Sequence, residues 1–241
     1  MVHLGRPGAD RVTFANARSV EGLEASRGRA RPPVLVTDHP DADTTGQAYT
    51  DRLATLEQAR WKQLLDVQAP YRWNLRRLLG QRRVLDIGCG IGRNLAHLGA
   101  GSVGVDHNRH SVRTCRDRGL TAFTDDEFLA LPPNQRGRFG GLLAAHVVEH
   151  LPPGCAAEVL APYLDYLENG REDDPDRIVL ICPQQRGFAS DPTHTVYFDQ
   201  DRLAQLCTEL GLVVDRQFSF PFPTWMGRAF TYNEFVTVAR R

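Results

Sequence analysis

A glycine-rich segment directly after a short apolar run is the part of this chain whose spacing says most about chemistry. In the sequence Val84-Leu-Asp-Ile-Gly-Cys-Gly-Ile-Gly92, every second residue from Gly88 onward is a glycine. Asp86 stands two residues before the first of these glycines. Glycine permits tight turning and close approach of the backbone to a ligand, and a following helix offers free amide donors. Asp106 ends the next apolar run, where an acidic side chain is placed to accept hydrogen bonds from ribose hydroxyls. The segment therefore predicts a binding loop for a nucleoside-containing ligand.

The glycine spacing distinguishes between two classes of such ligands. A dinucleotide fingerprint has the spacing Gly-x-Gly-x-x-Gly, which seats a pyrophosphate on the helix N-terminus. Here the glycines are Gly88, Gly90 and Gly92, and Arg93 stands where the last glycine of that fingerprint would be. The negative charge of Asp86 is poorly placed beside a pyrophosphate and well placed beside a cation. The loop therefore disfavours a nicotinamide oxidoreductase and favours a ligand that carries positive charge.

Short apolar runs alternate with helical patterns around this loop, as a parallel α/β sheet requires. We expect strands at 83–87, 103–106, 120–123, 139–145 and 177–182, and helices near 94–98, 109–118, 155–168 and 201–210. Two further strands, at 212–218 and 234–239, are joined without a helical pattern and should form an antiparallel hairpin. The prediction is a doubly wound, mostly parallel seven-stranded α/β sheet with this hairpin at one edge.

The region before the sheet has a different composition. Residues 1–45 are rich in Gly, Pro, Arg and Asp without sustained periodicity, and we interpret them as a flexible leader. Residues 46–80 show helical spacing of apolar side chains on both sides of Pro70, which predicts two helices. The predicted organisation is a leader at 1–45, a helical segment at 46–80 and the sheet domain at 81–241.

Composition excludes several other classes of protein. The 241 residues contain 29 basic and 29 acidic side chains, so a generic polyanion-binding surface is disfavoured. The five cysteines are odd in number and form no Cys-x-x-Cys pair, which argues against a disulfide scaffold and a zinc ribbon. No apolar run approaches the roughly 20 residues that span a bilayer. We expect a cytoplasmic protein that does not bind membranes.

With these features, residues 82–240 resemble the class I S-adenosylmethionine-dependent methyltransferases, which have a Rossmann-like fold. The resemblance is most specific at the acidic-Gly-x-Gly-x-Gly loop, and the segment His146-Val-Val-Glu-His-Leu151 matches a motif common in the branch that acts on small molecules. The terminal hairpin is similar to this family's seventh strand, which is inserted beside the fifth and sixth strands. The resemblance implies S-adenosylmethionine as cofactor and S-adenosylhomocysteine as product.

The resemblance also assigns cofactor-binding residues. The loop that holds the methionine portion corresponds to Asp86, Gly88, Cys89, Gly90 and Gly92. Asp106 matches the ribose-binding acid, and the neighbouring His107 is expected to help clamp the adenosine. Asp125 and Asp126 match the region that caps the adenine, and His146 is expected to contact the cofactor. In relatives the N-terminal helices fold over the cofactor, so residues 46–80 are interpreted as a lid.

The acceptor is expected to be a hydroxyl on a small molecule, glycan or lipid precursor. Methyl transfer depends mainly on holding the acceptor close to the methyl group in a water-poor site. A hydroxyl acceptor also benefits from a base, and histidine has a suitable pKa. His146 and His194 are the predicted bases, because both follow the C-terminal ends of strands. The aromatic loop between the last two strands is a candidate wall for the acceptor pocket.

A metal-dependent reaction is the alternative. His146, Glu149, His150 and His194 form a histidine and carboxylate set of the type that binds divalent metals. A similar set, Glu-x-x-Glu-His plus a later histidine, occurs in small-RNA 3′-terminal 2′-O-methyltransferases, but here His146 replaces the first glutamate. That alternative would act on RNA 3′ ends, catechols or diols. We predict no metal, a small-molecule acceptor without nucleic acid, and a monomer or homodimer. A non-catalytic cofactor-binding module is the remaining alternative.

Overall fold

The computed structural model describes residues 46–47, 50–51, 68–132 and 138–241. The chain divides into the units Met1–Pro33 and Val34–Arg241, and all of the described residues belong to the second. The predicted leader and most of the first predicted helix lie outside the described residues. Among the described residues, no helix is both long and apolar enough to cross a membrane.

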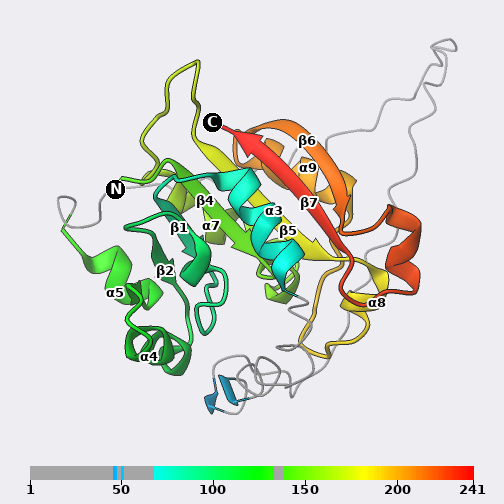
Figure 1. Cartoon of the computed structure of the whole chain (residues 1–241), viewed down its shortest axis with the longest axis horizontal. Coiled ribbons are helices and arrows are strands. Elements are labelled where there is room, and N and C mark those ends of the chain that lie inside the picture. Colours follow the sequence, from blue (N-terminus) through cyan, green and yellow to red (C-terminus); the bar gives the residue numbers. More distant parts are fainter. Residues whose placement is uncertain (1–45, 48–49, 52–67, 133–137) are drawn as a thin grey trace, which may run out of the picture. The chain divides into compact units, whose positions relative to one another are not determined.

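A seven-stranded sheet with the order β3-β2-β1-β4-β5-β7-β6 organises this unit (Figure 1). Its strands are β1 Val84–Ile87, β2 Val103–Val105, β3 Ala122–Phe123, β4 Gly141–Ala145, β5 Arg177–Pro183, β6 Val213–Phe220 and β7 Glu234–Arg240. The first five pair in parallel, whereas β7 is antiparallel to both β5 and β6. The predicted mostly parallel sheet with an antiparallel hairpin at one edge is confirmed, and the structure places β7 between β5 and β6.

Helices follow most of the strands. The α-helices are α3 Ala69–Leu79, α4 Arg109–Asp117, α5 Asp125–Ala130, α7 Ala156–Leu164, α8 Gln185–Phe188 and α9 Gln200–Glu209. The part of the chain that the structure describes also contains three short 3-10 helices, η1 Leu95–His97, η2 Val148–His150 and η3 Thr224–Arg228. Three of the four helices predicted in the sheet domain are confirmed as α-helices, and the one near 94–98 is the 3-10 helix η1.

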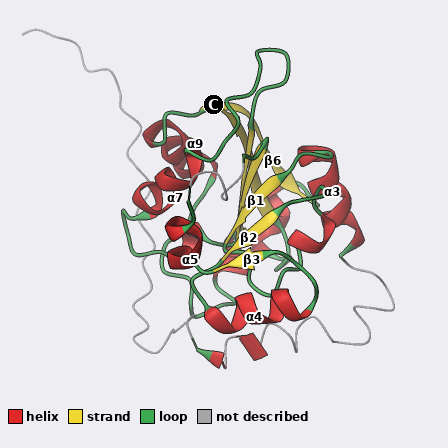
Figure 2. Ribbon diagram, turned by 90° about the vertical axis from the view of Figure 1, so that its left-hand side faces the viewer, coloured by secondary structure: helices red, strands yellow, loops and turns green. Residues whose placement is uncertain are grey.

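The two faces of the sheet bury separate apolar layers. Leu85 and Ile87 of β1 pack into a core with residues of α5, α7 and α9, whereas Val84 packs into a second core with α3. Figure 2 shows α5, α7 and α9 on one side of the strands and α3 on the other. Because side chains alternate along a strand, one apolar strand supplies both layers. Apolar layers on both faces therefore fix the positions of the strand ends.

One predicted strand boundary is wrong, and one helix was not predicted. Strand β6 continues to Phe220, so part of the aromatic segment expected as a loop belongs to the sheet. The sequence reading also omitted α5, although Thr124 and Glu127 form a complete capping box at its start. Ser or Thr followed three residues later by Glu is a sequence signature of a helix start. This signal could have located α5 from the sequence.

Phe128 anchors α5 to the core, and its truncation should destabilise the protein. Its ring is 1% exposed and meets the ring of Tyr166 edge-on at 4.9 Å between centroids. We expect Phe128→Ala to lower the free energy of unfolding by about 3–5 kcal/mol in denaturant titrations. The matched control Leu129→Ala, at a side chain 38% exposed, should change it by no more than about 0.5 kcal/mol. Equal losses in the two variants would contradict this placement of α5.

Candidate functional site

The glycine loop after β1 turns through backbone conformations that favour glycine. The φ angles are 67° at Gly88, 52° at Gly90 and 83° at Gly92. A Cβ atom at Gly88 would lie 2.4 Å from a methyl carbon of Val147, which follows β4. Glycine is therefore required at this position both by the turn and by the close approach of the next segment. The loop and the segment after β4 form one surface at the carboxyl ends of adjacent strands.

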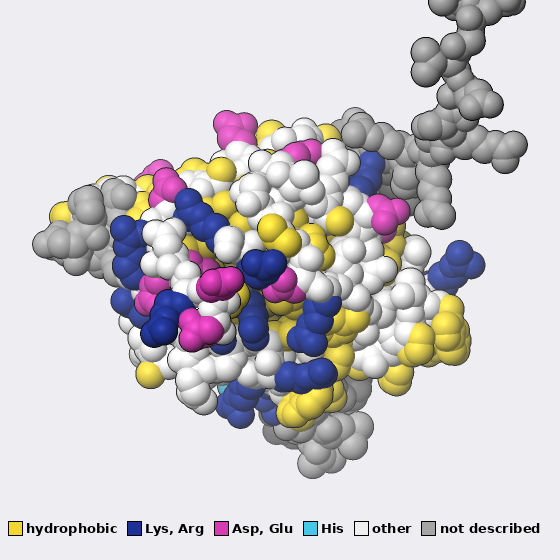
Figure 3. Space-filling model, turned by 90° about the horizontal axis from the view of Figure 1, so that it is seen from above, with side chains coloured by type: hydrophobic (Ala, Val, Ile, Leu, Met, Phe, Trp, Pro, Cys, Tyr) yellow, Lys and Arg dark blue, Asp and Glu magenta, His cyan; other side chains and the backbone are white. Residues whose placement is uncertain are grey.

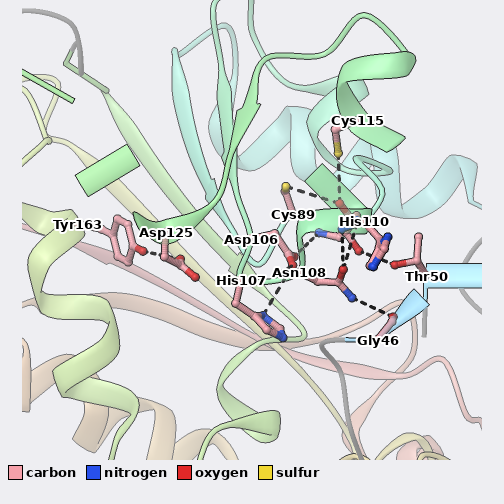
Figure 4. A network of polar contacts seen from close by, with 12 residues as sticks. Gly46, Thr50, Cys89, Asp106, His107, Asn108, His110, Cys115, Asp125 and Tyr163 are labelled. Carbon is pink, nitrogen blue, oxygen red and sulfur yellow. Dashed lines mark hydrogen bonds and ion pairs between the residues drawn. The ribbon is translucent and has the colours of Figure 1, made fainter. Parts of the chain in front are cut away.

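Asp106 holds this loop from the end of β2. Its Oδ2 atom accepts a hydrogen bond from the Gly90 amide at 2.8 Å, and its Oδ1 atom accepts one from the Asn108 amide at 2.8 Å (Figure 4). Each carboxylate oxygen has a second lone pair that can accept a further hydrogen bond. Asp106, the predicted ribose-binding acid, therefore fixes the conformation of the glycine loop.

Asp86 is a buried carboxyl group at the centre of β1. The residue is 1% exposed, and its Oδ2 atom has no hydrogen-bond partner in the described structure. Burial, with a smaller contribution from the charge of Asp106, raises the pKa of Asp86 to about 8. A buried carboxylate without a partner is unfavourable unless a cation or a proton neutralises it. The position therefore fits a cationic group of a bound ligand.

Asn108 is a site residue that the sequence reading missed. Its side-chain oxygen accepts hydrogen bonds from the amides of His110 and Ser111 at the start of α4, and its Nδ2 atom donates to the Gly46 carbonyl. Figure 4 shows these contacts beside Asp106. Asparagine directly before a helical pattern is an N-cap signal. That signal predicts the cap but not the contact with Gly46, which lies 62 positions away.

The other predicted cofactor residues differ in their burial and in their contacts. The Cys89 thiol is buried, and hydrogen bonding with Cys115 followed by burial raises its pKa, so it packs rather than reacts. His107 is exposed, and its Nδ1 atom lies 3.7 Å from Asp106 Oδ1. Asp125 begins α5 and accepts a hydrogen bond from the Tyr163 hydroxyl at 2.7 Å. The neighbouring Asp126 is exposed.

His146 directly follows β4 and lies between two carboxylates. Its Nε2 atom is 2.9 Å from Glu234 Oε1, and its Nδ1 atom is 3.2 Å from Glu149 Oε1. The backbone at His146 has a φ of 59°, which is uncommon for a residue with a side chain. Burial acts to lower the pKa of His146, but the contacts with Glu149 and Glu234 outweigh it and raise the pKa to about 10. Two facing carboxylates therefore favour the imidazolium form.

Glu234 is the second site residue that the sequence reading missed. It is the first residue of β7, and 88 positions separate it from His146. Its contact depends on the antiparallel pairing of β7 with β5, in which Glu234 stands opposite Pro183. Local sequence carries no signal for such a long-range contact.

The remaining three members of the predicted histidine and carboxylate set lie together. Glu149, His150 and His194 each offer a ligand atom, and these atoms lie within 4.8 Å of one another. The His150 and His194 rings have centroids 4.7 Å apart. Burial acts to raise the pKa of Glu149, but His146, His150 and His194 outweigh it and lower the pKa. Of the predicted set, His146 touches Glu149 and lies outside this group of three.

We compared the chain with known proteins. No protein-family model matches it, and neither does any curated protein. Solved structures do match. They include magnesium protoporphyrin IX methyltransferase from Synechocystis PCC 6803 with bound SAH, at 17% identity and a TM-score of 0.57, covering 83% of this chain and 97% of the other.

Two further solved structures also match the chain. The 1,6-didemethyltoxoflavin-N1-methyltransferase of Burkholderia thailandensis, with bound 1,6-didemethyltoxoflavin and S-adenosylhomocysteine, has 19% identity and a TM-score of 0.53, covering 86% of this chain and 94% of the other. A TehB-like SAM-dependent methyltransferase of Corynebacterium glutamicum has 19% identity and a TM-score of 0.54, covering 81% and 100%. The chain therefore has the fold of the class I S-adenosylmethionine-dependent methyltransferases.

Proposed function

We propose that this protein is an S-adenosylmethionine-dependent methyltransferase that methylates a hydroxyl of a small molecule, glycan or lipid precursor. The observation that carries the proposal is Asp86, a buried carboxyl group with an unpartnered oxygen, beneath a loop with three left-handed glycines. The fold supports it, since structural neighbours hold S-adenosylhomocysteine. A cationic amino-acid portion of the cofactor fits the carboxyl group of Asp86.

The residues of the loop network have distinct parts in this proposal. Asp86 neutralises the ammonium group of the methionine portion, and the backbone of Gly88 and Gly90 lies against that portion. Asp106 accepts hydrogen bonds from the ribose, with His107 beside it, and Asp125 and Asp126 lie at the adenine. When bound, the cofactor would supply a sulfonium methyl group for the acceptor oxygen, with S-adenosylhomocysteine as the product and the hydroxyl proton passing to a base or to solvent. The contribution of the protein is to position the two reactants and exclude water.

An aromatic cluster that precedes Glu234 in the chain supports a small, partly apolar acceptor. The rings of Phe222, Phe230 and Tyr232 meet edge to face in sequence, and Phe222 and Tyr232 are among the exposed large hydrophobic residues. Glu234, two residues beyond Tyr232, contacts His146. On the one face that Figure 3 shows, acidic side chains lie among the arginines, so that face carries charges of both signs.

The base roles of His146 and His194 stay predictions. His194 Nδ1 lies 2.8 Å from the Phe188 carbonyl oxygen, which only accepts hydrogen bonds, so Nδ1 carries the proton and Nε2 carries the lone pair. His146 in its imidazolium form has no lone pair to offer. The geometry therefore favours His194 over His146 as a base.

Binding of S-adenosylhomocysteine tests the cofactor site. We expect one molecule per chain by calorimetry, and at least a tenfold weaker affinity for Asp106→Ala, which is about 1.4 kcal/mol. The matched control is Asp117→Ala, at an exposed position near the end of α4. Because Asp106 also holds the loop, Asp106→Asn serves as a second variant that keeps the side-chain shape.

The same experiment separates the proposal from its rivals. Absence of S-adenosylhomocysteine binding together with binding of NADH would overturn the proposal in favour of an oxidoreductase. Binding of S-adenosylhomocysteine without methyl transfer to any member of a broad hydroxyl panel would replace the enzyme with a non-catalytic binding module.

Ligand binding should release a proton from Asp86. With a pKa of about 8, the Asp86 carboxyl group is mostly protonated at pH 7 in the free protein. A nearby ammonium group lowers this pKa, so binding releases up to about one proton and the affinity rises with pH up to about 8. Calorimetry in buffers with different ionisation enthalpies measures the released protons. Asp86→Asn should abolish the release, and an unchanged value in that variant would contradict this role of Asp86.

A further inference from the structure

His150 and His194 are held in the orientation that metal-binding histidines adopt. His150 Nδ1 lies 3.1 Å from the Thr193 carbonyl oxygen, and His194 Nδ1 lies 2.8 Å from the Phe188 carbonyl oxygen. Carbonyl oxygens only accept, so the proton of each neutral ring is on Nδ1 and the lone pair is on Nε2. A histidine ligand commonly donates its second ring N–H to a backbone carbonyl in this way.

Glu149 supplies the third donor. Its side chain is fully buried, and Oε1 has no hydrogen-bond partner among the described residues, because His146 at 3.2 Å is a close charge without hydrogen-bond geometry. The ligand atoms of Glu149, His150 and His194 lie within 4.8 Å of one another. Ligand atoms that each lie about 2.1 Å from one divalent ion are about 3–3.5 Å from one another. Small rotations of the three side chains would shorten their present separations to these distances.

The surrounding backbone fixes these three residues to one another. The amides of Thr195 and Val196 donate to the Glu149 carbonyl oxygen at 2.7 and 3.1 Å. Asp191 Oδ1 accepts hydrogen bonds from the amide and the hydroxyl of Thr193, next to the His150 ring. The loop that carries His194 is therefore tied to η2, which carries Glu149 and His150.

His146 is a neighbour of this group and not a member of it. Its two ring nitrogens face Glu149 and Glu234, so neither points to a shared ion. The donor set is therefore two imidazoles and one carboxylate. This set suits zinc, manganese, iron and cobalt, whereas magnesium prefers oxygen ligands alone.

We propose that Glu149, His150 and His194 bind one divalent transition-metal ion, with coordination positions left open for an acceptor oxygen. The site lies beside the glycine loop, because Val147, two residues before Glu149, makes the closest approach to Gly88. Open positions at such an ion suit an acceptor with two neighbouring oxygens, such as a vicinal diol or a catechol. The assignment of the acceptor depends on the proposed function, but the metal site itself does not.

Cobalt binding tests the site without any enzymatic assay. The full chain is stripped with a chelator and titrated with Co²⁺, and the visible absorption of the ion is recorded together with the calorimetric stoichiometry. We expect one ion per chain and at least a tenfold loss of affinity in Glu149→Gln, His150→Gln and His194→Ala. The matched control is His110→Ala, at an exposed histidine of α4, which should bind Co²⁺ as the wild type does.

Binding of S-adenosylhomocysteine by each variant keeps the result interpretable. His194→Ala removes a buried ring and can unfold the loop, so His150→Gln, at a partly exposed residue, carries the test if His194→Ala loses its circular dichroism spectrum. If the wild type binds S-adenosylhomocysteine but shows no saturable Co²⁺ binding, the metal site is overturned and the proposed function stands. Co²⁺ binding that survives both Glu149→Gln and His150→Gln would also overturn it. Co²⁺ binding without S-adenosylhomocysteine binding would confirm the metal site and remove the acceptor assignment.

Discussion

The parallel pairing of β1 with β4 is the constraint on which both parts of the site depend. It sets Ile87 opposite Ala144, so the glycine loop and the His146 segment leave the sheet side by side. Val147 then packs where a side chain at Gly88 would have to be. The order of the strands therefore creates a surface at which a loop suited to a nucleoside meets a group of histidines and carboxylates.

Buried carboxylates give this surface its electrostatic character. Asp86 and Glu149 are both removed from water, and each has an oxygen without a hydrogen-bond partner in the described structure. Burial of an unneutralised carboxylate is strongly unfavourable. The two carboxyl groups differ in their surroundings. Three histidines lower the pKa of Glu149, whereas no histidine is among the groups that shift the pKa of Asp86. Among the described residues, no cation is found among the groups that shift the pKa of Asp86, so this position suits a cationic ligand.

The sequence predicted those features that depend on local patterns and on strand order. The glycine loop, Asp106 at the end of β2 and the terminal hairpin follow from spacing and apolar periodicity, and the structure has all three elements. The capping box of α5 was equally readable and was overlooked. The partnership of His146 with Glu234 could not be predicted, because it depends on the register of β7 against β5. The same holds for the division of the histidine set, which required the orientation of each ring.

Ring orientation also decides between the chemical roles open to the histidines. A neutral imidazole has one lone pair, and at His194 the contact of Nδ1 with the Phe188 carbonyl leaves that lone pair on Nε2. Nε2 can accept a proton from an acceptor or bind an ion, but it cannot do both at once. His146 offers no lone pair while two carboxylates hold it as an imidazolium. If an ion occupies Glu149, His150 and His194, proton loss from a hydroxyl must be promoted by the ion itself, because a metal lowers the pKa of a bound hydroxyl group. Without an ion, His194 is the better placed of the two predicted bases, and the reaction depends on positioning together with that single ring.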